Sequence, residues 1–600
     1  MPKKKKVEFT HSKYQENIFE FIRHGVGNLV VEASAGSGKS YTLLKCLELI
    51  DNEQRILLSA FNRDIVNELK KKSKDMDNVH VMTLHGLGLS MLQKNYPNEA
   101  LELDEFKYRS YIWSNINSIS HIDLGSLSKR DHARYVENVF QYVSYGRCYL
   151  CQTEKDLELI EERYDIDTLA DEKEVALDVM EWGKQNLSTI DFTDMIYLPN
   201  VLMCKPYGLQ FDWIAVDEAQ DLSTAQREIV LKCRKINTRM LFFGDSNQCI
   251  YMFNSSDPAS FNELKNLPNT ISLPLSISYR CSKNIVNLAK TIVPSIEENG
   301  DGREGEVEYD VQLDKVEDGD MIICRNNAPL MQIYAEFLKM GKKCAIRGKD
   351  IGGNLTQMVK KTKCEKLQRE LYSDGVFPRL YSSLLQGVYE LMGRYNVTFD
   401  DAVASSSISS KYDMISTLEI LSEGLKTSDE LIEKVKEVFS DKKKVGISLS
   451  TIHKAKGLEA KNVYVACASL MPSSSAKKDW EMRQEHNLMY VAYTRAKDRL
   501  GFLDESTFER FSKASEKVKR LHAIEGLLES IYGKSEKKVD ASNMYVAKDI
   551  IRHATVISQP KATEKVMTLS RASMPQPQSG LGMLGGIMKR KVEKKKRIIR

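Results

Sequence analysis

The chain has 600 residues, of which 42% are hydrophobic and 28% charged, a composition typical of soluble globular proteins. This length is too great for one hydrophobic core, and we expect about four domains. No apolar run approaches about 18 residues, which argues against a membrane span. The start MPKKKKVEFT lacks the apolar segment of a secretory signal. Eleven cysteines, an odd number, favour a reducing compartment over a disulfide framework.

The formal net charge of +4 hides an uneven distribution of charge. The last twelve residues, KRKVEKKKRIIR, contain eight basic groups and one acidic group, and four lysines occupy positions 3–6. The rest of the chain is therefore mildly acidic. The basic ends have three interpretations: tethers to nucleic-acid phosphates, nuclear-localisation signals, or solubilising tails.

The first motif along the chain is a phosphate-binding loop. The run NLVV at residues 28–31 predicts a short buried strand, EASAGSGKS follows it, and YTLLKCLELI has helical spacing of apolar residues. Small residues let the backbone N–H groups turn toward phosphates, while Lys39 reaches the β- and γ-phosphates and the Ser40 hydroxyl reaches Mg²⁺. Ala33 stands where the strict pattern has Gly, so a glycine- and serine-rich turn without a ligand is the alternative.

Short apolar and β-branched runs recur between helical stretches. This alternation predicts an α/β fold in which helices cover parallel sheets. The runs form one group before about residue 275 and one after it, which predicts two lobes of the nucleotide-binding type. The runs are RILLSAF, VHVMTL, WIAVDE, RMLFFGD, GDMIICR, KKCAIRG, VGISLSTI, KNVYVACA and RLGFL.

Two charged, mostly helical stretches interrupt this pattern and are too long to be loops. The segment from about residue 556 is rich in Pro, Ser and Gly before the basic end, which predicts disorder. The expected organisation is a first lobe at 1–91 and 186–275 with a helical insertion at 92–185, a second lobe at 276–354 and 441–540 with a short insertion at 355–440, and a flexible basic tail at 541–600.

The run WIAVDEAQD at residues 213–221 ends an apolar strand in two adjacent acids. This arrangement suits metal chemistry: Asp217 can hold Mg²⁺ through its water shell, and Glu218 can orient and deprotonate an attacking water. The alternative is an exposed acidic turn, which the apolar strand and the preceding phosphate loop disfavour.

With VDEAQD, the sequence resembles the UvrD/Rep-like branch of superfamily 1 DNA helicases. Further matches follow in the family's order: GDSNQCIYMF at 244–253, SYRC at 278–281, TIHKAKGLE at 451–459 and EHNLMYVAYTRAK at 485–497. Shorter matches are YQ at 14–15, SAFNR at 59–63, TLHG at 83–86, DFTDM at 191–195 and CRNN at 324–327. The matches span about residues 10 to 505, and the fold they imply is two RecA-like P-loop lobes.

The resemblance implies an ATP site between the lobes. Gln15 would read the adenine edge, Tyr279 would stack on the adenine ring, and Glu459 would lie near the ribose or the phosphates. Gln248 would sense the γ-phosphate, and Arg280 and Arg495 would neutralise the transferring phosphoryl group. The implied catalytic residues are Lys39, Glu218, Gln248, Arg280 and Arg495. The implied nucleotide-binding residues are Gln15, Ala33, Ser34, Ala35, Gly36, Ser37, Gly38, Lys39, Ser40, Tyr279 and Glu459, with Ser40 and Asp217 for Mg²⁺.

The resemblance also implies a groove for single-stranded DNA, in which bases stack on aromatic side chains and phosphates are contacted without sequence readout. The implied DNA contacts are Phe61, Asn62, Thr83, His85, Tyr251, Phe253 and His453.

Four positions depart from the commoner family pattern. Tyr41 replaces an Arg after the phosphate loop, Asn254 stands where an Arg is usual, and His486 and Asn487 replace an Arg pair. None of these changes removes a group that hydrolysis requires. The short second insertion resembles compact relatives such as the F-box helicase group and phage-encoded versions.

Taken together, the resemblance implies an ATP-dependent DNA helicase that moves 3′ to 5′ on single strands and at junctions of single- and double-stranded DNA. A translocase that strips bound proteins, a scaffold with a vestigial ATPase, and a preference for RNA remain alternatives. The expected location is the cytoplasm of a bacterial or phage-infected cell, or the nucleus of a eukaryotic host. The sequence does not indicate the oligomeric state, and the basic tail could bind a protein or a nucleic acid.

Overall fold

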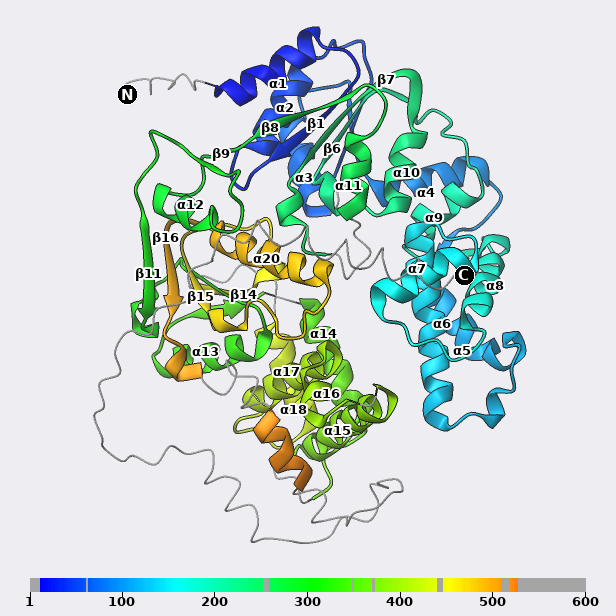
Figure 1. The fold of residues 1–600 in the computed structure, drawn as a ribbon, viewed down its shortest axis with the longest axis vertical. Helices are drawn as coiled ribbons and strands as arrows, with labels where there is room; N and C mark the ends of the chain where they lie inside the picture. Colours follow the sequence, from blue (N-terminus) through cyan, green and yellow to red (C-terminus); the bar gives the residue numbers. More distant parts are fainter. Residues whose placement is uncertain are drawn as a thin grey trace, which may run out of the picture. The chain divides into compact units, whose positions relative to one another are not determined.

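The computed structural model describes residues 11–60, 63–251, 258–347, 349–368, 373–395, 397–439, 446–508 and 518–526. Helices and strands alternate through most of these residues, and the strands form two large parallel sheets (Figure 1). The α/β class that the sequence predicts is therefore confirmed. The predicted flexible basic tail at 541–600 lies outside the described residues.

The first sheet has six described strands, all parallel, in the order β3-β2-β6-β7-β1-β8. Their bounds are β1 Asn28–Ala33, β2 Ile56–Ala60, β3 Val79–Thr83, β6 Phe211–Asp217, β7 Arg234–Gly244 and β8 Thr270–Leu275. Short pairs form elsewhere: β4 Glu102–Leu103 with β5 Thr189–Ile190, and β9 Ile277–Ser278 with β10 Glu297–Glu298.

Helices cover both faces of the first sheet. Successive strand residues point to opposite sides, so the apolar strands present apolar side chains on both faces. In β1, Leu29 and Val31 pack with residues of the first three helices, whereas Val30 belongs to the core of the other face, which extends from the sheet into the remaining helices. The helices of this half are α1 Lys13–His24, α2 Lys39–Glu48, α3 Arg63–Lys72, α4 Leu84–Asn95, α5 Lys107–Ile119, α6 Lys129–Tyr149, α7 Glu154–Tyr164, α8 Glu172–Gln185, α9 Asp194–Val201, α10 Thr224–Lys232 and α11 Pro258–Lys265.

Helices α5 to α8 pack against one another and, through α6, against α9 and α10, and their core contains a buried cluster of charges. Lys107 Nζ lies 2.8 Å from Asp194 Oδ2, and Arg147 Nη1 lies 2.9 Å from Asp191 Oδ2 and 3.0 Å from Asp194 Oδ1. The two acids belong to the DFTDM run. Their ion pairs satisfy charges that would otherwise be costly to bury, so this motif ties α5 and α6 to the start of α9.

The second sheet repeats the arrangement, with parallel strands in the order β11-β16-β15-β12-β14-β13. The bounds are β11 Glu306–Val311, β12 Met321–Cys324, β13 Cys344–Ile346, β14 Ile447–Thr451, β15 Ala460–Ala466 and β16 Ala496–Leu503. Its helices are α12 Lys283–Ala289, α13 Asn327–Lys339, α14 Lys349–Lys361, α15 Val376–Tyr395, α16 Phe399–Ala404, α17 Ser406–Leu421, α18 Ser428–Val438, α19 Ile452–Ala455 and α20 Asp479–Tyr493.

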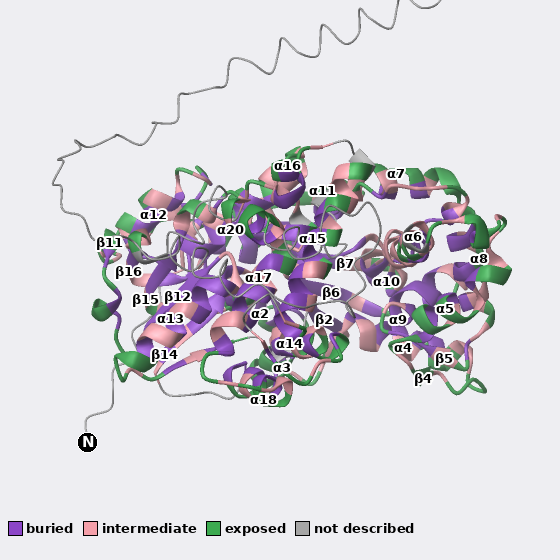
Figure 2. Cartoon of the chain, turned by 90° about the horizontal axis from the view of Figure 1, so that it is seen from below, coloured by how far each residue is buried: buried purple, intermediate pink, exposed green. Residues whose placement is uncertain are grey.

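The two faces of the second sheet have different coverings. Ile323 of β12 belongs to a core with residues of α12 and α20, whereas Ile322 belongs to a core that contains residues of α13 and extends into α14 to α18. Figure 2 shows burial concentrated along the strands, while exposed residues are frequent on helices such as α5 and α8. The helical stretch between β13 and β14 therefore shares its core with the second sheet.

All nine apolar runs named from the sequence lie on strands, and the two RecA-like lobes are present. The structure adds β8 and β11, each at the edge of its sheet. Both contain several exposed residues, so neither has the continuous apolar run by which the buried strands were recognised. Among the described helices, none combines the length and apolar character that a bilayer crossing needs.

Candidate nucleotide and DNA site

The phosphate loop lies where β1 leads into α2. Gly36 and Gly38 have φ values of 74° and 79°, a backbone conformation that residues with a Cβ adopt at a cost. The loop also packs closely on the segment after β9: Tyr279 N donates to Gly36 O at 2.9 Å, and a Cβ added at Gly36 would lie 2.4 Å from Arg280 Cβ. Both the conformation and the available space therefore require glycine at position 36.

Lys39, the first residue of α2, points to the acids at the end of β6. Its Nζ lies 2.5 Å from Glu218 Oε1 and 3.6 Å from Asp217 Oδ1. Burial alone would lower the pKa of Lys39, but Glu218 and Asp217 outweigh this effect and raise it. Lys39 is thus held as a cation between the loop and the acidic pair.

Glu218 occupies a strained backbone position with φ 55°. Its N–H donates to Asp217 Oδ1 at 2.9 Å, and Gln220 Nε2 donates to Glu218 Oε2 at 2.6 Å. Burial would raise the pKa of Glu218, but Lys39 and then Lys456 lower it to about 2. The carboxylate is therefore ionised and fixed in orientation at neutral pH.

Ser40 and Asp217 provide oxygen atoms of the kind that Mg²⁺ prefers. Ser40 Oγ donates to Asp217 Oδ2 at 3.2 Å, and burial raises the pKa of Asp217, against the effect of Lys39. A divalent cation beside this carboxylate would offset the cost of burying its charge. In the phosphate loop, Ser37 Oγ is buried and lacks a hydrogen-bond partner within the described residues. These groups fit a magnesium-bound phosphate.

The second lobe contributes two arginines at this site. Arg495 is 1% exposed, and its Nη2 donates to Gln248 Oε1 at 3.3 Å. Burial, and then Arg280, lower the pKa of Arg495 to about 9, so it stays protonated at neutral pH. Arg280 forms an ion pair with Glu459, with 2.7 Å between Nε and Oε2, and donates through Nη1 to Thr494 O at 3.2 Å.

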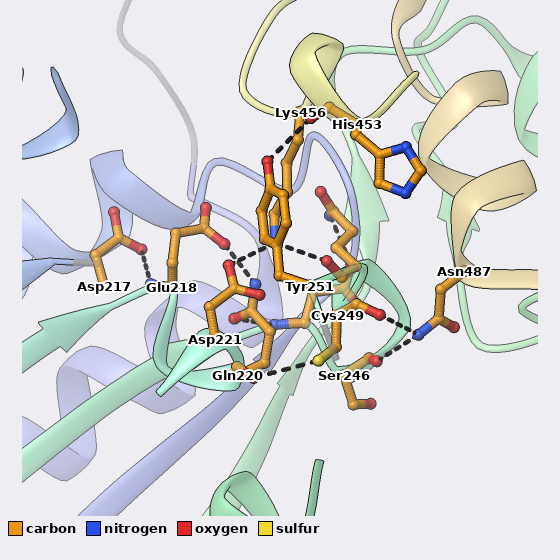
Figure 3. A network of polar contacts seen from close by, with 12 residues as sticks. Asp217, Glu218, Gln220, Asp221, Ser246, Cys249, Tyr251, His453, Lys456 and Asn487 are labelled. Atoms are coloured by element: carbon orange, nitrogen blue, oxygen red, sulfur yellow. Dashed lines mark hydrogen bonds and ion pairs between the residues drawn. The ribbon is translucent and has the colours of Figure 1, made fainter. Parts of the chain in front are cut away.

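Several side chains of the second lobe contact the segment that follows β7 (Figure 3). Lys456 Nζ lies 2.5 Å from Asp221 Oδ2 and donates to Gln248 O at 2.7 Å. Asn487 Nδ2 donates to Ser246 O at 3.2 Å and to Cys249 O at 2.9 Å. In the opposite direction, Tyr251 OH donates to His453 O at 3.0 Å. Residues 246–251 are therefore bonded to the second lobe at several successive points.

The other residues expected to bind the nucleotide have well-defined contacts. Gln15 accepts from Ser12 N at 3.0 Å and donates to Thr42 Oγ1 at 3.1 Å. Glu459 also pairs with Lys497 at 2.5 Å, and burial, which would raise its pKa, is outweighed by Lys497 and Arg280, which lower it. Gln15 lies beside the loop, because a Cβ at Gly38 would be 3.8 Å from Gln15 Nε2.

The residues expected to contact DNA lie in two groups. Tyr251 and His453 meet through the bond described above, and burial, Arg325 and Lys454 lower the pKa of His453 to about 3, so this ring is neutral. Thr83 caps α4 by accepting from Gly86 N at 3.1 Å, and burial lowers the pKa of nearby His85. Both lie where β3 ends, and β2 and β6 separate β3 from β7. Phe61, Asn62 and Phe253 lie outside the described residues.

Some residues of the site were not singled out from the sequence. Ala35 N in the phosphate loop donates to Tyr490 OH at 2.9 Å, and Lys456 reaches across the lobes. Gln220 Oε1 accepts from Asp245 N at 3.1 Å, while Asp245 Oδ2 accepts from Gln248 Nε2 at 2.7 Å. Tyr490, Lys456, Gln220 and Asp245 all lie inside the quoted motifs. The spacing of the motifs does not indicate which of their side chains meet.

The two parallel sheets, the phosphate loop and the arginines brought to it by the second lobe define a P-loop protein with two RecA-like lobes. Residues 14–269 match the family model of the UvrD/REP helicase N-terminal domain, and residues 354–504 match that of the UvrD-like helicase C-terminal domain. The two matches cover more than half of the chain, which belongs to the UvrD/Rep-like family.

Individual relatives are distant. The chain is 24% identical over 309 residues to the ATP-dependent DNA helicase Rep of Buchnera aphidicola, which covers 46% of this chain and 43% of that protein. It is 24% identical over 300 residues to the ATP-dependent DNA helicase PcrA of Bacillus subtilis, covering 46% and 38%. It is 23% identical over 517 residues to the F-box DNA helicase protein 1 of Schizosaccharomyces pombe, covering 80% and 56%. The chain thus spans less than two thirds of the length of each of these relatives.

Proposed function

We propose that this protein is an ATP-dependent DNA helicase that moves along single-stranded DNA in the 3′ to 5′ direction. The observation that carries the proposal is the composite site: Lys39 and Glu218 come from the first lobe, while Arg495 of the second lobe bonds to Gln248 of the first. A nucleotide held by residues from both lobes can move one lobe against the other when it is hydrolysed.

In this proposal Lys39 exchanges its ion pair with Glu218 for the β- and γ-phosphates of ATP. The pKa of Glu218 then rises from about 2, because Lys39 is the larger of the two cationic influences that lower it. Glu218 becomes a better proton acceptor and orients the attacking water. Arg280 and Arg495 stabilise the negative charge that develops on the transferring phosphoryl group. Ser40 and Asp217 would hold Mg²⁺, which supplies further charge neutralisation.

The DNA side of the proposal rests on the segment after β7. Gln248 lies at the nucleotide site, and Tyr251, three residues later, lies beside His453 of the second lobe. Loss of the γ-phosphate changes the surroundings of Gln248 and can thereby shift Tyr251. Tyr251, His453, Thr83 and His85 would contact the strand, and Phe61, Asn62 and Phe253 would extend this set.

The experiment is strand displacement on short duplexes that carry a single-stranded tail on one side only. We expect ATP-dependent unwinding of duplexes with a 3′ tail and little unwinding of those with a 5′ tail. The reverse preference would overturn the polarity. ATP hydrolysis stimulated by single strands without unwinding of either duplex would favour a translocase that strips bound proteins.

Two further outcomes separate the remaining alternatives. A vestigial ATPase would bind DNA but not hydrolyse ATP, although Lys39, Asp217, Glu218, Gln248, Arg280 and Arg495 are all present. Stronger stimulation by single-stranded RNA than by DNA would move the proposal to RNA, since stacking and phosphate contacts serve either strand.

The proposal extends to the organisation of the chain. The helical segments 92–185 and 355–440 would flank the strand where it enters and leaves the two lobes. The protein would act where the DNA is, in the cytoplasm of a bacterial or phage-infected cell or in the nucleus of a eukaryotic host.

A further inference from the structure

Asn487 occupies a position where the family commonly has Arg, and it is buried in the middle of α20. Its amide nitrogen has two N–H groups, and the structure gives this nitrogen two acceptors, Ser246 O and Cys249 O (Figure 3). The two carbonyls belong to the same short turn. One side chain of the second lobe thus holds both ends of a segment of the first lobe.

That segment contains Gln248, the residue that links the two sides of the nucleotide site. Gln248 donates to Asp245 and accepts from Arg495, and its backbone carbonyl accepts from Lys456. The residues bonded to Asn487 lie on either side of Gln248 in the chain. A shift of Asn487 would therefore displace the backbone that carries Gln248.

Asn487 also lies on the helix that reaches the phosphate loop. Tyr490, on the same helix and three residues later, accepts from Ala35 N of the loop, and Arg495 follows the end of α20. An α-helix is stiff over such a length. A displacement of Tyr490 and Arg495 therefore also displaces Asn487. The two hydrogen bonds from the Asn487 side chain would transmit this movement to residues 246–251, and so to Tyr251.

The chemistry of the surroundings explains why an amide suits this position. Lys456, which pairs with Asp221, and Arg495, which is fully buried, already bring two positive charges to the segment. An arginine at position 487 would bury a third positive charge beside them, at a cost in desolvation and repulsion. The asparagine amide supplies two donors without a charge.

We propose that Asn487 is a positioning residue that couples the state of the nucleotide to the strand-contacting residue Tyr251, through its two bonds to residues 246 and 249. This inference rests on the proposed function, because it assigns a part of the coupling between ATP hydrolysis and DNA. Asn487 bonds to the backbone on either side of Gln248, whereas Asp245 and Arg495 hold the Gln248 side chain, so we expect loss of Asn487 to affect the coupling more than DNA-free hydrolysis.

The test compares Asn487→Asp, which keeps the shape but removes both donors, with Asn487→Gln, which keeps them one carbon further out. His486→Ala is the matched control, since His486 is the neighbouring departure from the family pattern and lies on the exposed side of α20. ATP hydrolysis is measured with and without a single-stranded oligonucleotide, and binding of the oligonucleotide is followed by fluorescence anisotropy. Thermal unfolding of each variant is recorded in parallel.

We expect Asn487→Asp to keep the DNA-free rate within about twofold and the DNA affinity within about threefold, while the stimulation by DNA falls about tenfold. Asn487→Gln should recover part of the stimulation, and His486→Ala should match the wild type. Equal losses with and without DNA would overturn the inference, because they would indicate a purely structural role, and so would unchanged stimulation in Asn487→Asp. If the wild type itself shows no stimulation by DNA or RNA, the proposed function fails instead.

Discussion

The two lobes share a strand-to-helix turn but use it differently. In the first lobe, β1 leads through a glycine-rich loop into α2, and the loop amide of Ala35 faces Tyr490 of the second lobe. In the second lobe, β12 leads directly into α13, and the first N–H groups of that helix are capped from within: Asn327 N and Ala328 N donate to the Asp413 carboxylate at 2.9 and 3.1 Å. A helix N-terminus favours an anion in either case.

The two turns differ in whether the helix N-terminus is left open to an anion. In the second lobe an internal carboxylate already occupies the position that suits a phosphate, so that turn stabilises the fold. The second lobe instead contributes two cations, Arg495 and Lys456, to the site of the first lobe. In our proposal the turn of the first lobe binds the phosphates, whereas Asp413 caps the equivalent turn of the second lobe.

The largest effect is expected where the second lobe meets the nucleotide. Arg495→Ala should lower kcat for ATP hydrolysis by about a thousandfold, because it removes the buried guanidinium that would stabilise the transferring phosphoryl group. Arg495→Lys should recover little, since an ammonium group lacks the planar fork of donors. Binding of a fluorescent ATP analogue should change far less than kcat. Retention of more than a tenth of the wild-type rate in Arg495→Ala would remove the second lobe from the chemistry.

A pair of glycines sharpens the contrast between the lobes. Gly36 and Gly341 both have positive φ, 74° and 70°, but a Cβ at Gly36 would collide with Arg280, whereas none of the described atoms lies within 4 Å of a Cβ at Gly341. Gly36→Ala should raise the KM for ATP at least about tenfold, through backbone strain and the lost contact. Gly341→Ala should leave KM unchanged and lower the free energy of unfolding by only about 1 kcal/mol. Equal KM values in the two variants would contradict this assignment of the loop.

The pH dependence of ATP hydrolysis tests Asp245, which accepts a hydrogen bond from Gln248. Burial raises the pKa of Asp245 to about 6, although its bonds with Gln248 and Asn247 lower it. Asp245 is therefore ionised above pH 6 and takes up a proton below it, which weakens its bond to Gln248. When the pH is lowered from 7 to 5.5, kcat/KM should fall about fourfold, because Asp245 takes up one proton. Glu218, with a pKa of about 2, and His453, of about 3, do not titrate in this interval.

The control for this profile is Asp245→Asn, which should flatten the acidic limb. The stability contribution of Asp245 has the opposite sign: its pKa in the folded state lies above the ordinary 3.8, so it favours folding at low pH and this stabilisation is lost as pH rises through about 6. An acidic limb that persists unchanged in Asp245→Asn would assign the titration to another group.

The smallest effect on activity is expected at the closed turn of the second lobe. Asp413→Asn removes the charge that caps α13 and should lower the free energy of unfolding by about 1 kcal/mol, seen as a drop of a few degrees in Tm. The kcat per folded molecule should stay within about twofold, because in our proposal the nucleotide binds at the turn of the first lobe. A large loss of ATP hydrolysis at full stability would contradict the division of roles between the two turns.

The sequence predicts the fold well because the buried strands of parallel sheets are continuous apolar runs, such as those of β2 and β6. The edge strands β8 and β11 lack this signal. The order of the motifs also predicts which residues share the nucleotide site, since the carboxyl ends of parallel strands meet at one edge of a sheet.

Contacts between lobes could not be predicted in the same way. Tyr490 and Asn487 lie inside a recognised motif, yet their bonds to Ala35, Ser246 and Cys249 depend on how α20 sits against the first lobe. At position 487 the departure from the family pattern marks an unusual site, but only the structure gives the two carbonyls that an amide satisfies.

The central claim is that the two lobes form one ATP-hydrolysing site whose turnover is coupled to a nucleic-acid strand. The most direct measurement is steady-state ATP hydrolysis with and without single-stranded DNA, beside Glu218→Gln. We expect at least about tenfold stimulation by DNA, and a rate in Glu218→Gln that is lower by about a hundredfold or more under both conditions. Hydrolysis that is indifferent to DNA and RNA, or that survives in Glu218→Gln, would contradict it.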